Sequence, residues 1–226
     1  MSELLHFSEH RLQELALCIM AVVYTLRLRW LFKYKGGRDR QPPTGAQDTT
    51  PKKGIIYSWI NIATPWAMES TRNNVFLYVQ FVLFHIGVTL AIALSFIIPY
   101  APGLLQSLFF VRLIQAFTAL ACLIGVMRII RRVADPYMRA ISTPDDYFAI
   151  LLLTVWFFFA TLAAPNKAAG GESVLLTYFI LTAFFLVYVP FSKISHYLYY
   201  PFTRYWFGKT MGHRGVYPLR RGAIRN

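Results

Sequence analysis

The sequence has little charge and almost no cysteine. Charged residues make up 15% of its 226 residues, whereas soluble domains usually contain roughly 25%, so the composition excludes an ordinary cytosolic protein. The two cysteines, Cys18 and Cys122, form neither a CxxC nor a CxxCH motif. Their arrangement argues against a disulfide framework and against a covalently attached c-type haem.

The motifs of a stand-alone enzyme are also absent. The sequence has no nucleophile beside a base, no glycine-rich phosphate loop and no paired carboxylates in its apolar runs. It shows no internal repeat and no second domain. A transporter typically has inverted repeats or broken helices with polar groups near the middle of the membrane. Arg112 alone does not supply these features, so a small transporter is the weakest hypothesis.

Long runs without charge dominate what is present. They approach or exceed the ~20 residues that cross a ~30 Å hydrocarbon core, and they do not alternate like barrel strands. The longest run breaks at Pro99, Pro102 and Gly103. A weaker span begins with SEHRLQE, which is unlike the positive start of a cleaved signal peptide, so we expect this span to be retained. The sequence predicts an all-α integral membrane protein with a five-helix transmembrane bundle, at about 11–32, 75–98, 104–131, 146–165 and 172–199.

Positive charge predicts the orientation of these helices. Of the 23 Lys and Arg residues, 20 lie in the loop 27–72, the turn 128–139 or the segment after residue 192. Because basic residues collect in cytoplasmic loops, we expect the N-terminus outside and the C-terminus in the cytoplasm. The net charge of +13 then reflects topology and attraction to anionic membrane lipid, with no need for nucleic acid.

Two segments are expected to face the cytoplasm. The loop 33–72 contains GGRDRQPPTGAQDTTPKKG at 36–54, which is either a disordered linker or a docking loop for a soluble partner. Residues 207–226 form a basic cytoplasmic tail with the same two alternatives. The aromatic segment YLYYPFTRYWFG is typical of the membrane interface.

Two of the five histidines stand out. His6, His10 and His213 lie in segments outside the membrane, where we expect a histidine to be exposed to solvent and to have no chemical role. His85 lies in FVLFHIGVTL, about eleven residues or ~16 Å from an inner boundary near residue 74, at 1.5 Å per residue. His196 lies about one turn from an inner boundary near residue 200, six residues after Pro190, which should bend that helix. Both histidines are therefore expected in the cytoplasmic half of the membrane.

Histidines from two facing helices can each give one nitrogen to the iron of a haem. For either histidine alone, a hydrogen bond to a backbone carbonyl is an equally good interpretation. Zinc would require three or four ligands, and the apolar spans offer no carboxylate to complete such a set. The spacing leaves quinone and lipid sites open.

Four stretches carry a resemblance to a known family. They are RLRW, LFHIG, RIIRRVADPYMRAISTPDDYFAILLL and PFSKISHYLYYPF, and over about residues 15 to 206 the chain resembles the membrane cytochrome b subunits typified by the respiratory nitrate reductase gamma subunit. The resemblance implies that residues 1–206 are a cytochrome b domain holding haem b between its second and fifth helices. His85 and His196 match the axial ligands of the haem nearer the cytoplasm.

The chain departs from the two-haem members of this family. Their other two histidines fall here at Ser95 and Tyr178, so we expect one haem. In this respect the chain resembles the small cytochrome b subunits of sulfate-reducer transmembrane redox complexes of the high-molecular-weight cytochrome c type. Candidate partners of the haem propionates are Arg131, Arg132 and Lys193.

The function implied is that of an electron-transfer subunit in a bacterial or archaeal inner membrane. It would pass electrons between the quinone pool, or a neighbouring membrane subunit, and a cytoplasmic iron–sulfur protein. Menaquinone is a further candidate cofactor. The alternative is a haem-free membrane anchor that recruits a soluble redox partner.

Overall fold

The computed structural model describes residues 2–37, 39–64, 69–167 and 172–219, and every regular element in these ranges is helical. Five helices are long and apolar enough to cross a membrane: Glu3–Lys33, Val75–Tyr100, Leu108–Ala134, Pro144–Ala163 and Ser173–Phe191. The prediction of an all-α protein with five membrane spans is confirmed. The protein is therefore a multi-pass membrane protein.

The chain divides into two compact units, although the sequence shows no second domain. The first, here called the transmembrane unit, comprises Met1–Leu28 and Val79–Ile194. The second, here called the basic unit, comprises Arg29–Tyr78 and Ser195–Asn226. The basic unit holds 14 of the 23 basic residues and 3 of the 10 acidic residues, and thus +11 of the net charge of +13.

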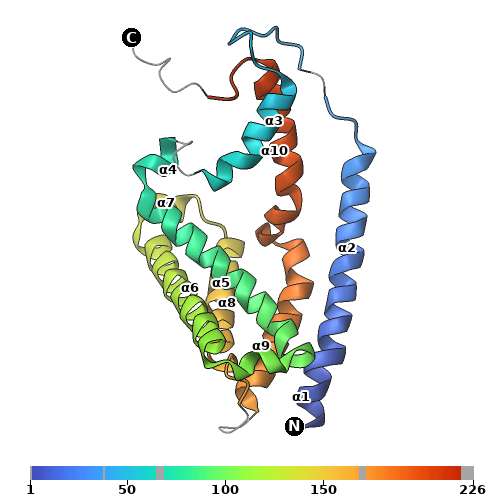
Figure 1. The fold of residues 1–226 in the computed structure, drawn as a ribbon, viewed down its shortest axis with the longest axis vertical. Helices are drawn as coiled ribbons and strands as arrows, with labels where there is room; N and C mark the ends of the chain where they lie inside the picture. Colours follow the sequence, from blue (N-terminus) through green and yellow to red (C-terminus); the bar gives the residue numbers. More distant parts are fainter. Residues whose placement is uncertain (1, 38, 65–68, 168–171, 220–226) are drawn as a thin grey trace. The chain divides into compact units, whose positions relative to one another are not determined.

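The transmembrane unit contains the helical spans and short connecting turns (Figure 1). Its elements are α1 (Glu3–Phe7), a π-helical turn (Ser8–Leu12), the start of α2 (Gln13–Lys33), α5 (Val75–Tyr100), a 3₁₀ turn (Pro102–Gln106), α6 (Leu108–Ala134), α7 (Pro136–Ala140), α8 (Pro144–Ala163) and α9 (Ser173–Tyr188).

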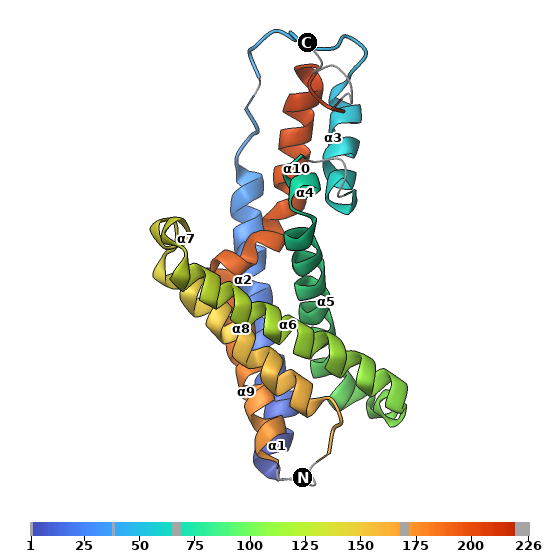
Figure 2. The same cartoon turned by 90° about the vertical axis from the view of Figure 1, so that its left-hand side faces the viewer.

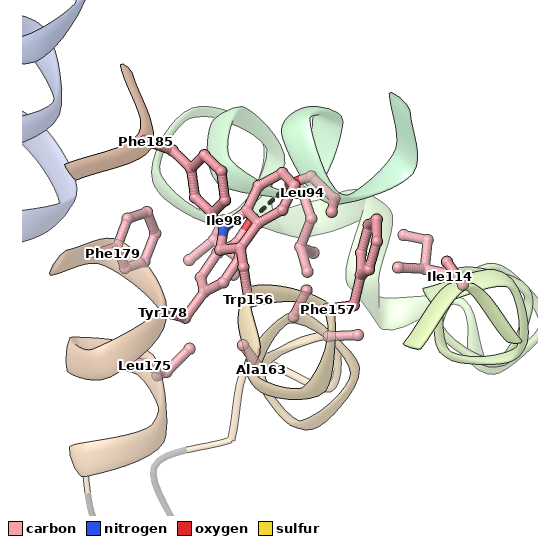
Figure 3. Close-up of a cluster of buried hydrophobic side chains, with 14 of the residues drawn as sticks. Leu94, Ile98, Ile114, Trp156, Phe157, Ala163, Leu175, Tyr178, Phe179 and Phe185 are labelled. Carbon is pink, nitrogen blue, oxygen red and sulfur yellow. Dashed lines mark hydrogen bonds between the residues drawn. The ribbon is translucent and has the colours of Figure 1, made fainter. Parts of the chain in front are cut away.

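Large aromatic side chains fill the core of the transmembrane unit (Figure 3). Trp156, Phe157, Tyr178 and Phe179 from α8 and α9 meet the buried faces of α5 and α6. Small residues let those two helices approach: a Cβ added at Gly87 would lie 2.3 Å from the Cβ of Ala121. Close contact through small residues is the usual way in which helices associate within a membrane.

The last span ends earlier than the sequence predicts. A single helix over 172–199 with a bend at Pro190 is wrong, because α9 stops at Tyr188 and 3₁₀ turns occupy Val189–Phe191 and Lys193–Ser195. Proline has no amide hydrogen to continue the helix, and Ser192 is extended, with φ −101° and ψ 171°. A new helix, α10, then runs over His196–His213.

The basic unit is built on two helices that lie side by side in both views (Figure 1, Figure 2). They are α3 (Pro51–Ile60) and α10, and the unit also contains the short α4 (Glu69–Asn73). A Cβ at Gly208 of α10 would lie 2.6 Å from the carbonyl oxygen of Gly54 in α3. Glycine at both positions allows the two backbones to touch. Trp59 Nε1 also donates to the carbonyl of Pro201, at 3.1 Å.

The segment before α3 is bound to the end of α10. The amides of Gly45 and Ala46 donate to the carbonyls of Arg214 and Gly215, each at 3.0 Å, and Arg214 holds Asp39 at 2.6 Å. That guanidinium lowers the pKa of Asp39 below its ordinary value, with help from the amide of Gln41. The expectations of a loop without regular structure and of a tail beginning at residue 207 are therefore corrected for the described residues.

Candidate functional site

His85 lies on α5, outside the packed core. The buried face of α5 carries Phe84, Gly87, Ala91 and Leu94, whereas His85 is exposed. Thr89, Ile92 and Phe96 follow it at helical spacing and are exposed as well. An exposed histidine at the head of an apolar stripe is costly if lipid alone covers it.

One nitrogen of His85 is already occupied. Its Nδ1 lies 2.7 Å from the carbonyl oxygen of Phe81, one turn earlier on α5. A carbonyl can only accept, so Nδ1 carries a hydrogen, and in the neutral ring Nε2 then carries the lone pair. No hydrogen-bonding partner reaches Nε2 among the described residues. This is the arrangement typical of metal-bound histidines, which donate their other ring hydrogen to a carbonyl or carboxylate.

Two phenylalanine rings lie near His85. The Phe81 ring centroid lies 4.2 Å from that of His85, and the Phe84 centroid lies 6.1 Å away. Phe84 belongs to the buried face of α5, and the guanidinium carbon of Arg128, from α6, lies 5.1 Å from its centroid. A flat apolar group bound at Nε2 that extended to Phe84 would meet this cation.

His196 is the first residue of α10 and is exposed. It belongs to the basic unit, whereas His85 belongs to the transmembrane unit. The two candidate ligands are therefore not brought together within either unit. Their pairing stays a prediction from the sequence.

Ser95 and Tyr178, the two positions that led us to expect one haem, are occupied by packed side chains. Tyr178 is fully buried, and its hydroxyl donates to the carbonyl of Ala91 at 2.6 Å, the dashed line in Figure 3. The Ser95 hydroxyl donates a hydrogen bond to the carbonyl of Ile92, at 2.8 Å. It also accepts one from Gln13 Nε2, at 3.3 Å. Both hydroxyls thus stabilise contacts between or within the helices.

Most basic residues proposed to meet propionates have other partners. Lys193 Nζ binds Asp146 and Thr143, at 2.8 and 2.9 Å, and Arg132 binds the hydroxyl of Ser142 at 2.6 Å. Arg131 is exposed. Sequence reasoning did not single out Arg128, because the predicted span ended at about residue 131 and Arg128 was counted among the basic residues of the turn 128–139.

Clustered metal ligands are absent from the part of the chain that the structure describes: it holds no group of three or more His, Cys, Asp or Glu side chains placed to bind an ion. Cys18 is exposed, and Cys122 directs its sulfur to the carbonyl of Thr154 at 3.5 Å.

Comparison with known proteins adds one distant relative. No family model matches the chain, and no solved structure matches it. A protein of Nitratidesulfovibrio vulgaris (strain Hildenborough) is 28% identical over 184 residues, which cover 75% of this chain and 74% of the relative. The name of that relative gives no function, so the similarity does not indicate what this protein does.

Proposed function

We propose that this protein is a haem b-containing membrane subunit of a respiratory redox complex. It passes electrons between the membrane, through the quinone pool or a neighbouring subunit, and a cytoplasmic iron–sulfur protein. The observation that carries this proposal is the state of His85, whose Nδ1 is tied to Phe81 while Nε2 is left with a lone pair on an exposed face.

The stripe around His85 suits the apolar plane of a porphyrin. Ile92 and Phe96 continue the same exposed face of α5, so an apolar ring bound there would have apolar side chains against it. The sequence offers His196 as the second axial ligand. A bound b-type haem supplies a one-electron ferric/ferrous couple, and two imidazoles fill both of its axial positions.

The core packing supports a single haem in place of two. The Tyr178 ring is fully buried among Trp156 and Phe179, and its hydroxyl is committed to Ala91. Placing a second haem there would require the removal of these aromatic contacts. We accordingly propose one haem per chain.

The charge distribution supports a bacterial or archaeal inner membrane as the location, with the basic unit in the cytoplasm. Most of the net positive charge belongs to that unit, in agreement with the tendency of basic loops to stay inside. The iron–sulfur partner would then meet the basic unit. Menaquinone is the candidate electron carrier in the bilayer.

Visible spectroscopy of the purified protein tests this proposal. We expect a reduced α band of the b-haem type and one haem per chain in the pyridine haemochrome assay. His85→Ala and His196→Ala should each abolish haem binding, because each removes one axial nitrogen. His213→Ala is the matched control, because His213 is an exposed residue at the end of α10.

Two results would contradict the haem proposal. One is a wild-type protein that lacks haem when the cells are supplied with haem precursor. The other is full haem content in both single variants. A ratio of two haems per chain would instead refute the argument from Tyr178.

The second candidate is a haem-free anchor for a soluble redox partner, favoured by the net charge of +11 on the basic unit. An acidic partner would be attracted to such a surface. If the protein is an anchor, the complex should still assemble in both histidine variants. It should dissociate on deletion of residues 36–50, which are bound to α10.

A further inference from the structure

Arg128 is a cation held inside a membrane span. It lies six residues before the end of α6 at Ala134, which is ~9 Å along the helix axis at 1.5 Å per residue. Its side chain is half-buried, and its guanidinium lies over the ring of Phe84 at 5.1 Å. The ring face attracts the cation but carries no charge to neutralise it.

No carboxylate pairs with Arg128 among the acidic side chains that the structure describes. The charged groups that act on it are Arg131 and Arg132 of its own helix, which have the same sign. A charge removed from water is costly unless an opposite charge meets it. The partial burial of Arg128 therefore favours contact with an anion, and none of the described acidic side chains supplies one.

The other inner basic residues are less suited to that anion. Lys193 is bound to Asp146, Arg132 is bound to Ser142, and Arg131 is exposed to solvent. Arg128 alone among these four combines partial burial, the absence of a described polar partner, and contact with the residue next to His85. The Phe84 and His85 ring centroids are 6.1 Å apart, so a ligand on Nε2 of His85 that extended as far as the Phe84 ring would meet this guanidinium.

We propose that Arg128 binds an anionic group of the ligand that covers the His85 face. This inference rests on the proposed haem function, and with haem b the anion is a propionate. A guanidinium meets a carboxylate through two parallel hydrogen bonds, so Arg128 orients the porphyrin about its axis. A lipid phosphate has the same acceptor chemistry and is the competing source of the anion.

A cation beside the haem edge also affects the redox equilibrium. The ferric haem carries one more positive charge than the ferrous haem, so Arg128 disfavours the oxidised state. Its removal should lower the midpoint potential. The same removal should weaken haem retention without abolishing it, because both axial histidines remain.

The test compares Arg128→Gln with Arg139→Gln, which makes the same charge change at an exposed position of α7. We expect Arg128→Gln to retain a reduced amount of haem with a clearly lower midpoint potential, and Arg139→Gln to match the wild type. An unchanged potential in Arg128→Gln, or an equal shift in both variants, overturns the proposal.

Bound phospholipid, measured as phosphorus per chain, separates the two sources of the anion. If Arg128→Gln loses phospholipid while haem content and potential stay unchanged, the anion is a lipid phosphate and the propionate proposal is wrong. If the Arg128→Gln protein does not accumulate, Arg128→Lys tests the proposal instead. Lysine keeps the positive charge but lacks the planar guanidinium that forms two parallel hydrogen bonds. We expect a potential close to that of the wild type but weaker haem retention in that variant, because the charge stays and the paired hydrogen bonds are lost; wild-type retention would overturn the pairing. A wild-type protein without haem refutes the proposed function itself, which is a separate outcome.

Discussion

Tyr178 should be among the most sensitive positions of the transmembrane unit. It is fully buried between Trp156 and Phe179, and truncating a buried aromatic residue to alanine typically costs about 3–5 kcal/mol. Tyr178→Ala should therefore lower the folding equilibrium constant at least about a hundredfold, since 1.4 kcal/mol is about tenfold. Tyr178→Phe keeps the ring and removes the hydroxyl with its hydrogen bond to Ala91, which we expect to cost about 0.6–1.5 kcal/mol.

Denaturant unfolding in detergent micelles, followed by tryptophan fluorescence, measures both variants. Tyr137→Ala is the control, because Tyr137 is 84% exposed on α7. The expected order of destabilisation is Tyr178→Ala, then Tyr178→Phe, then the control. If Tyr178→Ala is no more destabilised than Tyr137→Ala, Tyr178 does not pack as described and the argument for a single haem loses its support.

Two further predictions concern the basic unit. Gly208→Val should separate α3 from α10, because its Cβ would lie 2.6 Å from the carbonyl oxygen of Gly54. Gly37→Val serves as the control, because a Cβ at Gly37 would have no atom within 4 Å. We expect faster amide exchange over residues 51–60 in Gly208→Val alone, and equal exchange in both variants would contradict the packing. Arg214 lowers the pKa of Asp39, so its stabilisation is complete above the ordinary carboxyl pKa of about 4 and is lost as pH falls through the lower folded value. Protection of the Gly45 amide should accordingly fall on acidification in the wild type, and this loss should be absent in Asp39→Asn, where an equal decline would exclude the ion pair as the cause.

The membrane spans are predictable from the sequence because lipid imposes a simple condition on every residue of a span. A run such as 73–111 contains no charge, and only helices satisfy its backbone in hydrocarbon. The end of the fifth span was harder to predict. Pro190 indicated a distortion of the helix, but with Ser192 extended the helix ends there. No local sequence feature distinguishes a bent helix from one that ends.

Burial that depends on distant helices is not predictable from local pattern. Glu9 and Gln13 lie in a polar segment, SEHRLQE, that suggests exposure, yet they are 4% and 1% exposed. Gln13 is buried because its amide reaches Ser95, 82 residues later. The same limit applies to the candidate site. His85 was identifiable from its apolar surroundings, whereas the choice of Arg128 required knowledge of which helix lies beside Phe84.

The order of the chain has a consequence for synthesis of the basic unit. Its glycine contacts join Gly54 to Gly208 and Gly212, and the whole segment Val79–Ile194 of the transmembrane unit separates the two halves. During translation, α3 therefore stays without α10 until four further spans have been synthesised. Because contacts between distant residues form slowly, the basic unit is expected to be the last part of the protein to mature, after the spans are already in the membrane.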